Sequence, residues 1–303
     1  MKKASNLFLV IEIIILIISA VSLIRLHNIR KTRESYAYAQ QWNYSINQVE
    51  PVYNFQNSLE ESEKLNLLLS TCKDYYQNST LKTDYSFLFW NNFNDIRIFF
   101  SDKTSEIVGT TVYATYIKGG NFIVVNTRDF NLKSLDEQKA IIIHELAHAL
   151  TVSDENFFKG RGFNEVVAED LAFTICAQNG IDYDFTYSNS FCLYMLVWNI
   201  FGKTDTLKAY CNGELNNKLS DISNGFGTNF ADMLTVLNYY ELYQDKIDFS
   251  CSEIVCMAQE IIVHATVNKA NQELNFTARQ EMLDTCFNGL IIKNEYFSKL
   301  LSH

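Results

Sequence analysis

Residues that interrupt regular structure are rare in this chain of 303 residues, which holds one proline, Pro51, and eleven glycines. Proline and glycine punctuate helices and strands, so their scarcity predicts much regular structure, chiefly helix. Apolar residues make up 48% of the chain and aromatic residues 14%, which excludes an intrinsically disordered protein. The length allows one large domain or two modest ones, each with a hydrophobic core.

Basic residues are outnumbered by acidic ones, and the formal net charge is −10. The imbalance is uneven, because residues 1–33 hold six of the 25 Lys and Arg residues but only one of the 35 acidic residues, Glu12. The rest of the chain therefore carries 19 basic and 34 acidic residues, a net charge of −15. An acidic body is unsuited to neutralising phosphates, so we expect no nucleic-acid partner.

The seven cysteines include no C-x-x-C pair. Their odd number and scattered positions favour free, mostly buried thiols over a disulfide framework. One or two disulfide bonds remain an alternative for a body outside the cytoplasm.

One long apolar run begins the chain. Residues 7–24 carry no charge apart from Glu12, and a run of this length can form a transmembrane helix. We therefore expect residues 1–33 to be a single-pass membrane anchor with a basic flank, located in the cell membrane. A cleaved signal peptide ending near Ala20-Val21-Ser22 is the alternative.

The charges around this run point in two directions. Lys2 and Lys3 precede it as in a signal sequence, which favours an extracytoplasmic body. Four basic residues follow the run, and by the positive-inside rule they favour a cytoplasmic body: Arg25, Arg30, Lys31 and Arg33. We expect the body to be extracytoplasmic, and the basic flank remains the argument against it.

Beyond the anchor, hydrophobic spacing divides the chain into three parts. Residues 34–80 have helical spacing and predict a stalk or a set of N-terminal helices. Residues 81–180 mix strand and helix patterns, and residues 181–303 are almost entirely helical in pattern. This order predicts an α+β fold with a C-terminal helical lobe and an N-terminal transmembrane helix.

Three segments of the middle part have strand patterns: residues 96–100, 108–117 and 122–125. Lys118-Gly119-Gly120-Asn121 suits a hairpin turn, so we expect a small antiparallel sheet. The last strand is the best candidate for an exposed edge that receives an extended peptide substrate, through Ile123, Val124, Val125 and Asn126. An ordinary sheet that covers the core is the alternative.

A helix is predicted directly after these strands, over residues 135–150, where no glycine or proline occurs. Ser134 and Glu137 fit a capping box at its start. Residues 144–148 read H-E-L-A-H, which has the form H-E-x-x-H. Residues four apart share a helix face, so His144 and His148 can bind one zinc ion.

Glu145 projects ~100° away from His144 around the helix axis. It therefore lies beside the metal, where a general base for a zinc-bound water is needed. The alternative is two core histidines around a chance glutamate.

A second helix is predicted from Asn164, a plausible cap. Glu165 and Glu169 are four residues apart on it, so either carboxylate can reach the zinc ion if the helix returns antiparallel to the first. Zinc-bound histidine usually donates its other ring N–H to a carboxylate. If Glu165 binds zinc, Glu169 or Asp170 is well placed to hold His144.

The H-E-x-x-H motif followed by Asn164-Glu165 in a second helix resembles the gluzincin metallopeptidases, which include thermolysin-like and aminopeptidase-like enzymes. The segment Gly162-Phe163-Asn164-Glu165-Val166-Val167-Ala168-Glu169 also resembles a form found in many bacterial zincins. The resemblance covers about residues 110–177. It implies a zincin catalytic core at residues 81–180, with His144, His148 and Glu165 as zinc ligands.

Two departures from the family pattern bear on the site. Sixteen residues separate His148 from Glu165, slightly fewer than usual, so Glu169 remains an alternative ligand. Val166 stands where the aminopeptidase pattern has glycine, which leaves aminopeptidase specificity open.

The resemblance implies a membrane-anchored zinc metallopeptidase that acts on peptide or protein substrates, with Glu145 as general base. Such enzymes usually add a residue that stabilises the oxyanion, for which Tyr210 is our first candidate. Four further residues are candidates for oxyanion stabilisation, namely Tyr183, Tyr187, Tyr239 and His264. The alternative function is a non-catalytic envelope protein that uses the site for structural zinc or for binding a partner.

Overall fold

The computed structural model describes residues 59–89, 91–101, 113–117, 121–151, 161–223, 230–242 and 251–302. These residues are mostly helical and include one small mixed sheet, in agreement with an α+β fold. The predicted transmembrane run, residues 7–24, lies outside them, as does the first half of the predicted stalk. Within the described ranges, no helix combines the length and the apolar character needed to cross a membrane.

The sheet has three strands, β1 (Arg97–Ser101), β2 (Ala114–Ile117) and β3 (Phe122–Asn126), in the order β1-β3-β2. The pair β2 and β3 is antiparallel, as the predicted hairpin requires. The pair β1 and β3 is parallel, with Ile98 beside Ile123. The prediction of a wholly antiparallel sheet is therefore wrong, because the chain crosses from β1 to the far side of β3 before it forms the hairpin.

The prediction that β3 is an edge strand is also wrong. Its residues Ile123, Val124 and Val125 pair with neighbours on both sides. Asn126 pairs with Ser101 of β1, and its N–H donates to the carbonyl oxygen of Tyr113 just before β2. Consecutive side chains of β3 are fully buried, because β3 occupies the centre of the sheet and both of its faces are covered. Among the described strands, the edge beside the H-E-x-x-H helix is β2.

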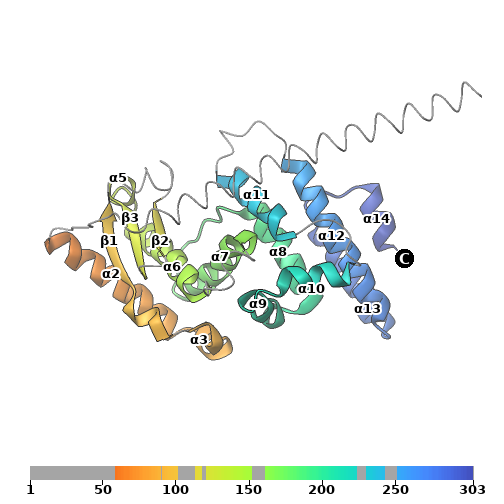
Figure 1. Cartoon of the computed structure of the whole chain (residues 1–303), viewed down its shortest axis with the longest axis horizontal. Helices are drawn as coiled ribbons and strands as arrows, with labels where there is room; N and C mark the ends of the chain where they lie inside the picture. Colours follow the sequence, from red (N-terminus) through yellow and green to blue (C-terminus); the bar gives the residue numbers. More distant parts are fainter. Residues whose placement is uncertain are drawn as a thin grey trace, which may run out of the picture.

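Two helices cover the sheet, α2 (Leu59–Gln77) and α6 (Leu135–Thr151). Helix α2 packs on β1 and on α6, and α6 lies beside β2 (Figure 1). The hydroxyl of Tyr76 in α2 donates to the carbonyl oxygen of Ile143 in α6 at 2.7 Å. Short elements complete this end of the molecule: α3 (Thr80–Asp84), η1 (Ser86–Leu88), η2 (Asn91–Asp95) and α5 (Thr127–Phe130).

Helix α6 begins as its sequence predicts. The backbone N–H of Glu137 donates to Oγ of Ser134 at 3.3 Å, and the backbone N–H of Ser134 donates to Oε2 of Glu137 at 2.8 Å. This is the reciprocal pairing of a capping box. Helix α6 packs chiefly against α7 (Arg161–Gln178), and this pair of helices carries the chemical motifs.

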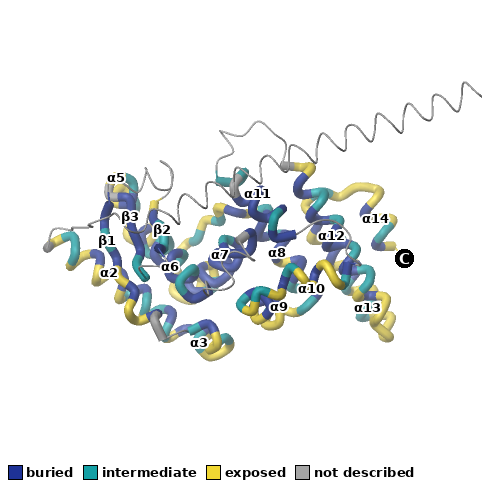
Figure 2. Tube along the Cα trace, in the orientation of Figure 1, coloured by how far each residue is buried: buried dark blue, intermediate teal, exposed yellow. Residues whose placement is uncertain are grey.

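Helix α7 starts three residues before the predicted cap, so Asn164 lies inside the helix. The C-terminal lobe contains α8 (Ser188–Phe201), α9 (Lys203–Cys211), α10 (Leu215–Ile222), α11 (Phe230–Leu242), α12 (Cys251–Gln272), α13 (Phe276–Gly289) and α14 (Glu295–Leu301). Figure 2 shows buried residues running from the sheet through α7 into α8, α11 and α12. One hydrophobic core therefore joins the sheet end to the helical lobe.

Candidate metal centre

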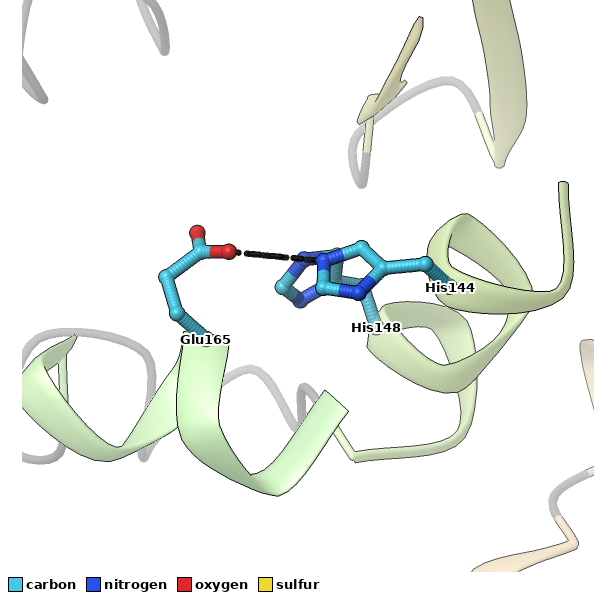
Figure 3. Close-up of side chains that lie close together, drawn as sticks. All are labelled: His144, His148 and Glu165. Atoms are coloured by element: carbon cyan, nitrogen blue, oxygen red, sulfur yellow. Dashed lines mark hydrogen bonds and ion pairs between the residues drawn. The ribbon is translucent and has the colours of Figure 1, made fainter. Parts of the chain in front are cut away.

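His144 and His148 project from α6 toward Glu165 on α7, as Figure 3 shows. Their Nε2 atoms are 3.1 Å apart, and Oε2 of Glu165 is 3.5 Å from Nε2 of His144 and 3.4 Å from Nε2 of His148. Two neutral imidazole nitrogens repel at this separation unless they share a proton or a metal ion. The three residues can hold a metal ion between them.

The size of this triangle fits zinc. Zinc bonds to nitrogen or oxygen of about 2.0–2.1 Å at tetrahedral angles place the ligand atoms about 3.3–3.4 Å apart. The three observed distances lie within a few tenths of an ångström of that value. The site is also reachable from solvent, because the side chains of His144, His148 and Glu165 are 16%, 13% and 32% exposed.

The Glu165 carboxylate and the two imidazoles shift the pKa values of Glu165 and His148. Burial alone would raise the pKa of Glu165, but the two imidazoles outweigh it and hold that pKa well below its usual range. Burial alone would lower the pKa of His148, but the Glu165 carboxylate outweighs it and raises that pKa to about 8. The carboxylate is thus ionised at neutral pH, which is the state that binds a cation.

Glu145 is buried, and its Oε2 accepts the backbone N–H of Tyr116 in β2 at 2.7 Å. Burial raises the pKa of Glu145, and the nearby His148 and His144 oppose that rise. A carboxylate with a raised pKa next to a metal site can take up a proton and return it. The role of Glu145 as a general base beside the metal stays a prediction, and its bond to the sheet was not predicted.

Tyr210, our first candidate for oxyanion stabilisation, is buried in α9, and its hydroxyl donates to Oδ1 of Asn164. Asn164 precedes the ligand Glu165. The contact therefore fits a residue that positions the start of α7, and the oxyanion role of Tyr210 stays a prediction.

Glu169 does not bind the metal in this geometry. Its Oε1 accepts the backbone N–H groups of Thr186 and Tyr187 at 2.6 and 3.1 Å. Asp170 forms an ion pair with Lys203, with Oδ1 and Nζ 2.6 Å apart. The prediction that Glu169 or Asp170 holds His144 through a direct bond is therefore wrong. Glu169 bonds to the loop after α7, and Asp170 bonds to Lys203.

Tyr183 occupies the place predicted for that carboxylate. Its hydroxyl oxygen lies 2.7 Å from Nδ1 of His144, the ring nitrogen that does not face Glu165. The sequence made Tyr183 a candidate for oxyanion stabilisation, which is a different role. The sequence spacing of Tyr183 and His144 does not predict this contact. It depends on how the loop between α7 and α8 folds back toward α6.

None of the other candidates for oxyanion stabilisation belongs to the candidate metal group in the described part of the chain. Tyr187 immediately precedes α8, and His264 belongs to α12, whose main neighbours are α8, α10, α11 and α13. The side chain of Tyr239 is outside the described part of the structure. Cys176, which lies in α7, is buried and free. Among the described residues, the candidate metal group contains His144, His148 and Glu165 alone.

We compared the chain with protein-family models, curated proteins and solved structures, and none of them matches it.

Proposed function

We propose that the protein is a zinc metallopeptidase that hydrolyses peptide bonds in peptide or protein substrates. The observation that carries the proposal is the triangle of Nε2 of His144, Nε2 of His148 and Oε2 of Glu165, with sides of 3.1 to 3.5 Å. Structural zinc sites are closed by four protein ligands, whereas catalytic sites have three. The described residues supply three, which favours catalysis over structural zinc.

Each residue has a defined role in this proposal. His144, His148 and Glu165 would hold the zinc ion, which supplies a Lewis acid and an acidified water molecule when bound. Glu145 would act as the general base, taking a proton from water on its carboxylate and giving it to the leaving amine. Its bond to the N–H of Tyr116 fixes the carboxylate while one oxygen remains for the proton.

The edge strand β2 supports a peptide as the substrate. An extended peptide that adds to a sheet edge aligns its backbone along that edge. Because Tyr116 of β2 contacts Glu145 directly, a peptide beside β2 would place its bonds next to the base. This replaces the edge predicted on β3. The apolar run at residues 7–24 is the basis for proposing that the enzyme is anchored in the cell membrane.

The test is cleavage of a set of fluorogenic peptides by the zinc-loaded full chain and by Glu145→Gln. The glutamine of this variant keeps the size of the side chain but cannot accept the proton. We expect wild-type cleavage to be abolished by a chelator, and the variant to lose about 100-fold or more in kcat while it retains zinc. Unchanged cleavage by Glu145→Gln would refute the assigned base.

A further inference from the structure

The contact between Tyr183 and His144 determines which nitrogen of His144 can bind a metal. Nε2 faces Glu165, so for this nitrogen to bind a metal the ring proton must sit on Nδ1. Nδ1 lies 2.7 Å from the Tyr183 hydroxyl oxygen, which can accept that proton in a hydrogen bond. The two rings are nearly parallel, with an angle of 16° between their planes. Tyr183 therefore holds the ring in the orientation that metal binding needs, and its hydroxyl can accept the proton of the metal-binding tautomer.

Aromatic packing fixes Tyr183 in this place. Its ring meets Phe185 edge to face, with the ring centroids 5.4 Å apart. Phe185 in turn packs against Phe173 of α7 at 5.2 Å and Phe191 of α8 at 4.7 Å. The loop between α7 and α8 thus presents Tyr183 from a packed aromatic cluster.

Glu169 fixes the backbone of the same loop. It is buried in α7, one turn beyond Glu165, and its Oε1 accepts the N–H groups of Thr186 and Tyr187. The helix that supplies the third ligand therefore also holds the loop that supplies Tyr183. Hydrogen bonds from two backbone amides to one carboxylate oxygen restrict the loop more than packing alone.

We propose that Glu169 and Tyr183 together position His144, with Glu169 acting through the loop backbone and not through a direct bond to the imidazole. We call this pair the Glu169–Tyr183 support. It rests on the proposed zinc site and deepens it, since it assigns the orientation of one ligand to a tyrosine. Both are positioning residues, because each acts on His144 and neither belongs to the candidate metal group of the described residues.

The first test is the zinc affinity of Tyr183→Phe, measured by competition with a chromophoric chelator. Loss of a hydrogen-bond partner of a metal ligand typically weakens metal binding by about 10–100-fold, and we expect a loss in that range. The control is Tyr194→Phe, which removes a hydroxyl from a buried tyrosine of α8, and its affinity should stay within about twofold of wild type. Unchanged zinc affinity in Tyr183→Phe would overturn the proposal.

A spectroscopic readout separates positioning from general destabilisation. In the zinc-loaded wild type, the Nδ1–H proton of His144 should give a slowly exchanging NMR signal, because it is held by Tyr183. Tyr183→Phe should lose this signal or exchange it rapidly, while the melting temperature is retained. A protected His144 Nδ1–H in Tyr183→Phe would contradict the support.

Two substitutions of Glu169 test whether it acts through the loop. Glu169→Gln keeps a carbonyl oxygen that can accept from Thr186 and Tyr187, whereas Glu169→Ala removes the acceptor. The proposal predicts zinc affinity within about threefold of wild type for the first and a loss of about tenfold or more for the second. An equal loss in both would overturn it, because then the charge of Glu169, or direct metal binding, is what matters.

A double variant tests the coupling. If Glu169 acts through Tyr183, Glu169→Ala combined with Tyr183→Phe should weaken zinc binding less than the product of the two single effects. Fully additive losses would contradict the coupling. These readouts are zinc affinity, NMR proton exchange and melting temperature, and none of them depends on cleavage. A protein that shows these affinity changes but cleaves no peptide would uphold the support and refute the proposed peptidase activity.

Discussion

The backbone N–H of Tyr116 donates to Oε2 of Glu145 at 2.7 Å, which ties the edge of the sheet to the helix that carries two of the proposed metal ligands. The bond fixes the orientation of the proposed base from a different element than its own. Its contribution to catalysis can be measured.

Replacing Tyr116 by proline removes this N–H. Tyr116 lies on the edge strand and its N–H points to Glu145, so proline costs no hydrogen bond between β2 and β3. A hydrogen bond to a charged group contributes about 1.5–3 kcal/mol, so we expect kcat for peptide cleavage to fall about tenfold or more. Zinc affinity should change little.

The matched control is Tyr116→Phe, which keeps the N–H and removes only the hydroxyl bond to Oδ1 of Asn121. Its kcat should stay near that of wild type. If both variants lose the same activity, the N–H of Tyr116 has no special part in orienting Glu145.

Gly162 permits the close approach of α7 and α11. A Cβ at this position would lie 2.0 Å from the carbonyl oxygen of Ala231 and 2.7 Å from Cβ of Leu234. Gly162→Ala must therefore move one helix, and we expect a loss of about 1–3 kcal/mol in the free energy of unfolding, measured in urea. Because Glu165 is less than one turn away, zinc affinity should fall as well.

Gly289→Ala is the control for this substitution. Its Cβ would meet Cδ2 of Leu196 at 2.5 Å, which is the movable end of a side chain. We expect a smaller loss of stability and an unaltered zinc affinity. Equal losses in both variants would contradict the role given to the contact between α7 and α11.

Burial raises the pKa of Glu169 to about 7 in the metal-free protein, against the opposing influence of His144. In an unfolded chain a glutamate titrates near ~4.3. The folded state thus binds more protons between these two pH values, so the free energy of unfolding falls as pH rises from ~4.3 toward ~7. Glu169→Gln cannot titrate, and we expect it to lack this fall, which amounts to ~3 kcal/mol.

The measurement is urea unfolding of both proteins with a chelator present, at several pH values across that range. The difference between the two curves isolates Glu169, since His148 and Glu165 titrate in both proteins. Parallel curves would show that the Glu169 carboxyl does not have a raised pKa.

Local signals in the sequence predicted the parts of the fold that depend on neighbouring residues. The capping box of Ser134 and Glu137 and the absence of helix breakers placed α6 correctly. The spacing of His144 and His148 placed both imidazoles on one face, and Glu165 meets them. Periodicity also predicted the strand segments, because alternation and β-branched residues act within each strand.

Contacts between distant segments were not predictable in this way. Strand patterns do not state which strand pairs with which, so the parallel pair of β1 and β3 was missed. The run Phe122-Ile123-Val124-Val125 did carry a usable signal, since consecutive apolar residues suit a strand buried on both faces. The sequence held no such signal for the contact of Tyr183 with His144, because Glu169 and aromatic packing place the loop that makes this contact.

The central claim is that His144, His148 and Glu165 bind one zinc ion. Its most direct test is the zinc content of the purified full chain after dialysis, compared with that of the double variant His144→Ala and His148→Ala. The account predicts one zinc ion per chain in the wild type and none in the variant. A wild-type protein that holds no zinc after incubation with it, or a double variant that holds as much as the wild type, would contradict the account.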